Sequence, residues 1–308
     1  MVRRTRSDTF LPRSDDLNVA RRHRILAPKT QTLPLVFSSP HSGCDYPTDF
    51  IAKSRLDPTT LRRSEDSFVD ELFSAAPECG APLVAADFPR AYVDVNREPY
   101  ELDPAMFDEA LPAFVNTHSP RIAAGLGTIA RVVASGVDIY RGKLTFAEVE
   151  QRIQQCYYPY HAALRYLIEQ TLARFGYCIM IDCHSMPSLS TLTGGPGNAN
   201  RIDFVLGDHH GESCDPAITG AAAALLRSCG YQVGLNKPYA GGFITTHYGR
   251  PADGVHVLQI EISRDIYMDE ASLQRGPGLK RLAAEIRILI QRLGALDPGS
   301  LTPVLAAE

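Results

Sequence analysis

Short apolar runs and longer amphipathic segments alternate along most of the chain. Runs rich in strand-forming residues predict strands, and apolar residues at helical spacing predict helices. The predicted strands are 33–39, 82–86, 91–95, 177–183, 203–207, 231–235 and 255–263, and the predicted helices are 58–79, 145–175, 217–230 and 269–294. This alternation is typical of an α/β fold, so we expect one domain with a mixed, mostly parallel central sheet and helices on both faces.

Local signals mark several of these boundaries. Asp57-Pro58 is a favourable helix start, because proline fits the first helical turn. Residues 145–148 form a T-x-x-E capping box, and Pro159 predicts a kink or break in the helix that follows. Long loops are predicted at 98–120, which has four prolines and is a candidate lid, and at 188–201, which is rich in Gly, Asn and Thr.

Composition narrows the class of protein. The 308 residues carry a formal net charge of −4, which argues against a nucleic-acid partner recognised by overall positive charge. Apolar runs fall short of the roughly 18 residues of a membrane helix, so we expect no membrane partner. The seven cysteines form no C-x-x-C pair and the basic N-terminus lacks a signal-peptide core, which favours a cytoplasmic location. We expect residues 1–30 to be a tail and lead-in, 31–296 the domain, and 297–308 a second tail.

Two histidines stand at predicted strand ends, where α/β sheets bind their ligands. His41 follows the first predicted strand, and His184 follows the run 177–183. Each is a candidate metal ligand or general base. Asp182 points to the same side of an extended chain as His184, so its carboxylate is a candidate orienting partner. The alternatives are a turn histidine at position 41 and a structural Asp–His pair at 182–184.

A candidate carboxylate ligand lies in the predicted helix 58–79. Glu65 and Asp66 stand among apolar residues, and the spacing does not choose between them. A charge run on a helix is usually a solvated face, whereas a carboxylate that faces inward needs a cation. Two histidines and one carboxylate are a standard set for a hydrolytic zinc ion with water at the open position. Here three separate segments would supply that set.

Polar residues flank the predicted strand 91–95. Arg90 precedes it, and Asn96 and Arg97 follow it. Guanidinium groups suit carboxylates and oxyanions, so this segment is a candidate for binding an anionic group. The alternative is a structural ion pair of Arg90 with Asp94.

Glu261 interrupts the apolar strand 255–263. A charged residue in such a strand must be paired or functional. Glutamate is a plausible general base beside a metal-bound water. The alternative is a structural pair with Arg264.

Several segments, taken in order, resemble the N-formylglutamate amidohydrolase family over about residues 33–290. They are SSPHSGCDYP, RRSEDSFVDELF, FPRAYVDVNREPYELDP, YYPYH, IDCHSMPS and LQIEISRDIYMDE. The family is similar to the zinc carboxypeptidases and their deacylase branch, which implies a zinc-carboxypeptidase-like fold for the domain 31–296. The resemblance also implies a zinc-dependent hydrolase that cleaves N-formyl-L-glutamate to formate and L-glutamate, the last step of one histidine-degradation route.

The resemblance carries metal ligands to named positions. The deacylase branch uses a His-x-x-Glu motif, in which His41 matches the histidine and Cys44 stands at the glutamate position. Asp66 matches the acidic position of the family, with Glu65 as the alternative, and His184 matches the third ligand.

The remaining roles follow in the same way. Asn96 and Arg97 match the clamp on the substrate carboxylate, Arg90 matches the arginine that polarises the scissile carbonyl, and Glu261 matches the catalytic glutamate. The resemblance thus implies a small-molecule partner, an N-formyl amino acid, and Zn²⁺ as cofactor.

Three other interpretations are open at this stage. A zinc deacylase for another N-acyl amino acid would use the same catalytic residues. A non-catalytic binding protein on the same fold would not need both histidines, Glu261 and two arginines. A thiol amidase built on Cys183 and His184 is disfavoured, because adjacent strand residues point to opposite faces.

Overall fold

A seven-stranded mixed sheet forms the centre of the computed structural model, which describes residues 22–133, 136–188, 201–297 and 299. The strand order is β1-β3-β2-β4-β7-β5-β6. Strands β3, β2, β4 and β7 run parallel, β1 is antiparallel to β3, and the parallel pair β5–β6 is antiparallel to β7. The strands are β1 (His23–Leu26), β2 (Leu35–Ser39), β3 (Leu83–Ala86), β4 (Cys178–Met186), β5 (Phe204–Gly207), β6 (Val233–Leu235) and β7 (Val255–Ser263).

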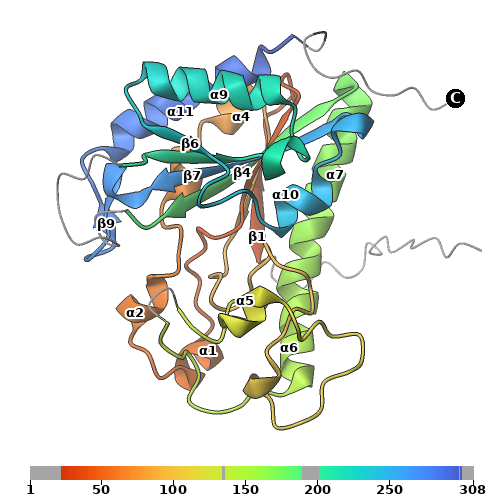
Figure 1. The fold of residues 1–308 in the computed structure, drawn as a ribbon, viewed down its shortest axis with the longest axis vertical. Coiled ribbons are helices and arrows are strands. Elements are labelled where there is room, and N and C mark those ends of the chain that lie inside the picture. Colours follow the sequence, from red (N-terminus) through yellow and green to blue (C-terminus); the bar gives the residue numbers. More distant parts are fainter. Residues whose placement is uncertain (1–21, 134–135, 189–200, 298, 300–308) are drawn as a thin grey trace, which may run out of the picture.

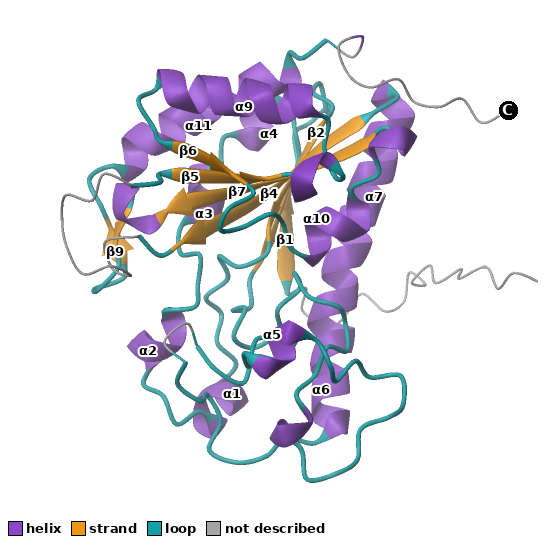
Figure 2. Cartoon of the chain, in the orientation of Figure 1, coloured by secondary structure: helices purple, strands orange, loops and turns teal. Residues whose placement is uncertain are grey.

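Helices cover both faces of this sheet (Figures 1 and 2). On one face α7 (Tyr158–Phe175) packs against β2 and β4. On the other face, α11 (Leu279–Gly294) packs with α9 (Pro216–Ser228) and with two short helices, α3 (Val69–Leu72) and α4 (Ala76–Cys79). Each face has its own cluster of buried hydrophobic residues. The expected α/β domain with a mostly parallel sheet and helices on both faces is confirmed.

The segments after β2 and β3 leave the carboxyl edge of the sheet and build the lower part of the molecule (Figure 1). This part contains loops and four short helices. The helical run 146–175 then leads from it back to the sheet. The four short helices are α1 (Thr48–Lys53), α2 (Pro58–Arg62), α5 (Pro120–Ala123) and α6 (Phe146–Arg152). The region beside the carboxyl ends of the strands therefore has the strand ends on one side and long connecting segments on the other.

The helical run 146–175 shows how sequence signals set its boundaries. Thr145 is the N-cap, and its hydroxyl accepts a hydrogen bond from the Glu148 amide, as the capping box predicts. A π-helical turn at Ile153–Tyr157 separates α6 from α7, and Pro159 falls in the first turn of α7. The irregularity predicted at Pro159 is thus a π-helical turn inside a continuous helical run, and not a break.

The predicted helix 58–79 is wrong as a continuous helix. Asp57 caps α2 as expected, but the chain leaves the helix after Arg62 and re-enters it only at Val69. The Asp66 amide donates to the carbonyl of His41 rather than to a helical partner. Phe68 then adopts a left-handed conformation with φ of 67°, which ends any continuous helical path. Asp66 therefore lies on a loop beside His41.

Two other predicted elements need correction. Residues 91–95 form turns and a short loop: the amides of Tyr92 and Val93 both donate to the carbonyl of Pro89 instead of to a neighbouring strand. The helix predicted from 269 begins at Leu279, after the Gly-Pro-Gly sequence 276–278, because proline disfavours a helical conformation in the residue before it.

Several shorter elements complete the structure. Residues upstream of α11 form a hairpin of β8 (Met268–Asp269) and β9 (Gln274–Arg275). Strand β1 was not predicted and lies in the segment expected to be a tail and lead-in. The helix α10 (Phe243–Tyr248) lies in the long glycine-rich connection to β7. The other short elements are 3₁₀ turns at Pro104–Met106, His209–Gly211, Pro251–Asp253 and Arg264–Ile266.

The predicted loops have different outcomes. The segment 98–120 is mainly loop, as expected, whereas 189–200 of the second predicted loop lie outside the described residues.

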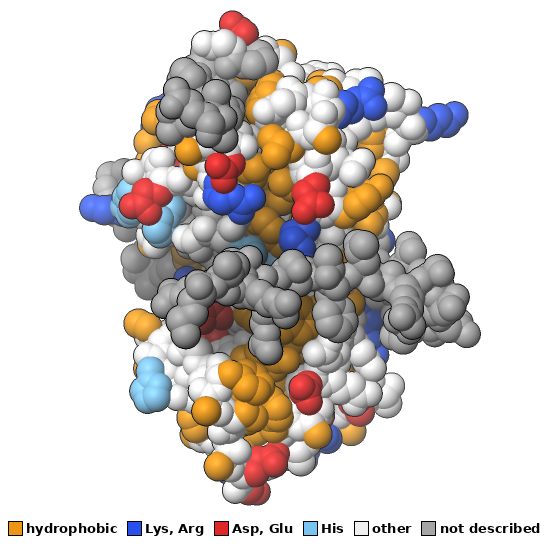
Figure 3. All heavy atoms as spheres, turned by 90° about the vertical axis from the view of Figure 1, so that its right-hand side faces the viewer, with side chains coloured by type: hydrophobic (Ala, Val, Ile, Leu, Met, Phe, Trp, Pro, Cys, Tyr) orange, Lys and Arg blue, Asp and Glu red, His pale blue; other side chains and the backbone are white. Residues whose placement is uncertain are grey.

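Figure 3 shows the side of the molecule that faces right in Figure 1, where hydrophobic side chains gather among polar ones. Tyr158 and Tyr166 of α7 are among the exposed aromatic residues. Within the described ranges, every helix is too short or too polar to span a bilayer.

Candidate active site

The candidate site lies at the carboxyl ends of the central parallel strands. His41 follows β2, His184 belongs to the last third of β4, and Glu261 lies near the end of β7. The loop after β3 adds Arg90, and the broken helical segment adds Asp66. Parallel strands end at one edge, so residues far apart in sequence meet there.

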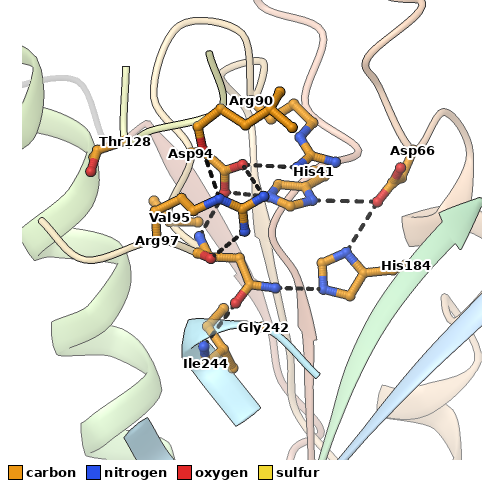
Figure 4. Close-up of polar contacts among 12 residues, drawn as sticks. His41, Asp66, Arg90, Asp94, Val95, Arg97, Thr128, His184, Gly242 and Ile244 are labelled. Atoms are coloured by element: carbon orange, nitrogen blue, oxygen red, sulfur yellow. Dashed lines mark hydrogen bonds and ion pairs between the residues drawn. The ribbon is translucent and has the colours of Figure 1, made fainter. Parts of the chain in front are cut away.

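Asp66 lies between the two predicted histidine ligands (Figure 4). Its Oδ2 is 3.4 Å from His41 Nδ1 and 3.1 Å from His184 Nδ1. All three residues are buried, and the potential ligand atoms of the set lie within 4.8 Å of one another. The structure thus brings together the three residues that the sequence predicts as metal ligands.

Each histidine has a separate carboxylate at its other ring nitrogen. His41 Nε2 is 2.8 Å from Asp94 Oδ1, and His184 Nε2 is 2.9 Å from Asp182 Oδ2. If each Nε2 carries the proton and donates it to that carboxylate, both Nδ1 atoms have free lone pairs that face Asp66. Such a carboxylate–histidine pair fixes the tautomer of a metal-ligating histidine. The partner Asp182 was predicted from its spacing to His184.

The donor set fits a zinc ion. Two neutral imidazoles and one carboxylate match a catalytic zinc site that keeps one position open. Among the described residues, His41 Nδ1 is a buried atom that makes no hydrogen bond, although it faces Asp66. A buried acceptor of this kind normally has a partner, and a cation at this point would supply one.

The electrostatics of the triad also suit a cation. Burial by itself would raise the pKa of Asp66, but the hydrogen bond to His184 and the charges of His41 and Arg264 hold it well below its ordinary value. Burial would lower the pKa of His184, but the charge and hydrogen bond of Asp182 raise it well above its ordinary value. A metal ion at this position would therefore compete with a proton for His184.

Glu65 faces away from this set. Its carboxylate accepts hydrogen bonds from Arg62 at 3.0 Å and from the hydroxyls of Tyr46 and Ser67, both at 2.8 Å. This buried residue already has a full set of partners. The geometry therefore favours Asp66 over Glu65 as the third ligand.

Cys44 and Cys183 lie outside the triad of His41, Asp66 and His184. Cys44 is exposed and lines a separate surface pocket with Arg24 and Asp87. Cys183 is buried in the hydrophobic cluster on the far face of the sheet, and burial raises its pKa well above the ordinary value. A thiolate, which a thiol amidase needs, is therefore disfavoured at Cys183.

Glu261 is held beside His184 by the sheet. The two residues are paired partners in the parallel ladder of β4 and β7. Gln259 Nε2 donates to Glu261 Oε1 at 2.9 Å, and Gln259 Oε1 accepts from the Gly242 amide at 2.8 Å. Burial raises the pKa of Glu261 to about 7, against the opposing charge of His184. A carboxyl group with this pKa is suited to accept and return a proton near neutral pH.

Arg90 and Arg97 share one buried carboxylate. Arg90 donates to Asp94 Oδ2 at 2.8 Å, which is the ion pair foreseen as the structural alternative, and Arg97 lies 3.8 Å from the same oxygen. Arg97 also donates to two backbone carbonyls, those of Asn96 and Leu126. Burial lowers the pKa of Arg97, and the charge of Asp94 only partly offsets this. Arg97 is thus a partly buried cation that lies near the carboxylate of Asp94, which is hydrogen-bonded to Arg90.

Asn96 makes contacts within the protein that the sequence does not predict. Its Nδ2 lies 3.1 Å from His184 Nε2 and donates to Asp182 at 3.2 Å, while its Oδ1 accepts from the Ile244 amide at 2.8 Å. Gly242 packs so closely on this side chain that an added Cβ would lie 2.4 Å from its amide. The role of Asn96 as a substrate ligand stays a prediction.

Three other residues of the site were not given these roles from sequence. Asp94 was considered only as a partner of Arg90, yet it also contacts His41. Gln259 gave a weak signal, a polar residue two positions before Glu261 and therefore on the same face of β7. Arg264 was considered as a partner of Glu261, but its hydrogen bond of 3.0 Å goes to Asp66.

Comparisons with known proteins agree with these observations. A family model described as N-formylglutamate amidohydrolase matches residues 33–268. A curated protein named N-formylglutamate deformylase from Pseudomonas aeruginosa is 30% identical over 275 residues, which cover 87% of this chain and 96% of the relative. A protein of the same name from Pseudomonas putida is 29% identical over 242 residues, covering 77% of this chain and 83% of the relative.

Solved structures give the same result. The crystal structure of N-formylglutamate amidohydrolase from Ralstonia eutropha is 38% identical, has a TM-score of 0.83, and the match covers 89% of this chain and 98% of that one. A gene product of Agrobacterium tumefaciens, 18% identical with a TM-score of 0.59 and coverage of 89% and 95%, shares the fold. The chain therefore belongs to the N-formylglutamate amidohydrolase family and is a hydrolase that acts on a linear amide bond.

Proposed function

We propose that this protein is a zinc-dependent amidohydrolase that cleaves N-formyl-L-glutamate to formate and L-glutamate. The observation that carries the proposal is the convergence of His41 and His184 on a single oxygen of Asp66, in a chain of this family. The substrate is proposed from the names of the relatives. A place in histidine degradation belongs to the same proposal and rests on the resemblance, and a cytoplasmic location is proposed from the cysteine pattern and the N-terminal sequence.

The metal would be held by Nδ1 of His41, Nδ1 of His184 and Oδ2 of Asp66. When bound, zinc supplies a water whose pKa is lowered to roughly 7 and a positive charge for the scissile carbonyl. Asp94 and Asp182 hold the two imidazoles in the tautomer that leaves Nδ1 free. These carboxylates are therefore part of the proposed metal centre although they would not touch the metal.

Glu261 is the proposed proton carrier. Its carboxylate takes a proton from the attacking water and delivers it to the leaving amine. In the metal-free protein burial raises the pKa of Glu261 to about 7, and a carboxyl group that titrates near neutral pH can both accept and return a proton. Gln259 holds one of its oxygens and limits the orientations that the carboxylate can adopt.

Arg90 and Arg97 are the proposed anion-binding residues. Arg90 would stabilise the negative charge that develops on the formyl oxygen, and removing one such donor typically costs about 10²–10³ in rate. Arg97 would bind a carboxylate of the substrate, with Asn96 beside it. Both arginines lie next to Asp94, which holds Arg90 in place through its Oδ2. Arg90 and Arg97 share the single carboxylate of Asp94, and the bound substrate would bring them a second negatively charged group.

Product analysis tests the proposed substrate. The zinc-loaded protein is incubated with N-formyl-L-glutamate, N-acetyl-L-glutamate and N-formyl-L-glutamine, and formate, acetate and free amine are followed by NMR. We expect fast release of formate and L-glutamate and much slower turnover of the other two compounds. Faster hydrolysis of the acetyl compound would instead indicate a deacylase for other N-acyl amino acids.

A further inference from the structure

Arg264 is a buried arginine that joins three segments of the site. It begins the 3₁₀ turn Arg264–Ile266, directly after β7. Its Nε donates to Ser185 Oγ at 3.2 Å, and its Nη1 donates to the carbonyl of Arg63 at 3.1 Å. Its Nη2 donates to Asp66 Oδ1 at 3.0 Å. One guanidinium therefore ties the end of β4 and the loop after α2 to the carboxylate of the triad.

The two oxygens of Asp66 have different partners. Oδ1 accepts from Arg264, whereas Oδ2 faces the Nδ1 atoms of His41 and His184. The backbone of the same residue is also fixed, since the Asp66 amide donates to the His41 carbonyl at 3.0 Å. The carboxylate is thus held at both its backbone and its outer oxygen, and only Oδ2 is directed at the centre of the triad.

We propose that Arg264 is a positioning residue that keeps Asp66 a one-oxygen ligand and so keeps a coordination position open for water. This inference rests on the metal site proposed above. A carboxylate free to rotate can bind a metal through both oxygens and would then occupy the position that a hydrolytic site leaves for water. A planar guanidinium with three fixed donors prevents that rotation more effectively than a single ammonium group.

The binding of a small anion to the cobalt-substituted protein tests this role without substrate. Metal-free protein is loaded with Co²⁺, because the visible spectrum of bound Co²⁺ reports the coordination geometry. Azide is then titrated as a ligand for the open coordination position. The wild type is compared with Arg264→Gln, Arg264→Lys and Arg250→Gln. Arg250 is an exposed arginine paired with Asp253, so it serves as the matched control.

We expect the wild type and Arg250→Gln to show a four-coordinate spectrum that azide changes. Arg264→Gln should still bind one Co²⁺, but its spectrum should differ because a second oxygen of Asp66 takes the place of water. It should bind azide roughly 10–100-fold more weakly, the size of effect that follows the loss of a residue orienting a metal ligand. Arg264→Lys separates position from charge: it keeps the positive charge but not the three contacts, so it should also be impaired. It carries the test alone if Arg264→Gln does not fold.

Two results would overturn the inference. One is an unchanged spectrum and unchanged azide affinity in folded Arg264→Gln or, where that variant does not fold, in Arg264→Lys. The other is a wild-type response in Arg264→Lys, because this would mean that only the charge matters. Failure of the proposed function is a separate outcome, since protein that binds Co²⁺ and azide as expected but does not release formate would contradict only the substrate assignment.

Discussion

Glu261 and His184 are paired residues on the adjacent parallel strands β7 and β4. The sheet therefore fixes the proposed proton carrier next to a proposed metal ligand through backbone hydrogen bonds of two fully buried strands. A site built on strands holds its residues more precisely than a site built on loops. The distance between the Glu261 carboxylate and the His184 imidazole should therefore change little when substrate binds.

Replacing Glu261 by glutamine should remove the proton carrier but keep the metal. We expect Glu261→Gln to retain its zinc and a near-normal KM, while kcat falls by roughly 10²–10⁴, the usual effect of losing general acid–base catalysis. Steady-state kinetics with N-formyl-L-glutamate and zinc analysis of the same preparation check this. A kcat close to that of the wild type would exclude the assigned role.

The same substitution should stabilise the metal-free protein at neutral and alkaline pH. Burial raises the pKa of Glu261 to about 7 from 4.5, so the folded protein binds the proton more tightly than the unfolded chain. Stability is then lost as the pH rises from 4.5 to about 7, and glutamine avoids this loss. The gain should be at most about 3 kcal/mol at about pH 8 and should vanish below about pH 4.5. Urea unfolding of chelator-treated wild type and Glu261→Gln measures it, and a less stable variant at about pH 8 would indicate a structural role.

Asp66 and Glu65 should differ in their effect on metal binding. Asp66→Ala removes the oxygen that both histidines face, so zinc affinity should fall steeply. Glu65→Ala breaks contacts with Arg62, Tyr46 and Ser67, so it should lower the melting temperature while zinc affinity changes only modestly. Competition with a chromogenic chelator gives both affinities. The reverse ranking would show that Glu65 is the ligand.

Arg97 should act on substrate binding more than on chemistry. Lysine lacks the bidentate fork of arginine, so Arg97→Lys should mainly raise the KM for N-formyl-L-glutamate. The matched control is a formyl amine without carboxylates, whose turnover the substitution should hardly change. Equal effects on the two substrates would mean that Arg97 does not recognise the carboxylate.

Six of the seven strands of the central sheet were predicted from the sequence, whereas β1 was missed. The run 255–263 predicted β7 with its observed bounds, because an apolar stretch buried on both faces has a clear composition. The predicted helix 58–79 and strand 91–95 were wrong where polar site residues take backbone and side-chain partners from distant segments. Asp66 bonds to the backbone of His41, and Asp94 bonds to the carbonyl of Thr128. Tertiary contacts of this kind override local patterns.

The site was predictable in its members but less so in its contacts. His41, Asp66 and His184 were named from sequence, and the structure brings them together. The hydrogen bond of Arg264 to Asp66 joins residues 198 positions apart, and that of Asp94 to His41 joins residues 53 positions apart. No local spacing rule relates such residues, since only the course of the chain places them side by side.

Metal removal and return, measured by formate release, shows whether hydrolysis requires the proposed zinc ion. Wild type and His184→Ala are stripped with a chelator, dialysed, and assayed with N-formyl-L-glutamate before and after addition of Zn²⁺. We expect that stripped wild type is inactive, that about one zinc per chain restores its activity, and that His184→Ala neither binds the metal nor recovers activity. Full activity of the stripped wild type, or of His184→Ala, would contradict this expectation.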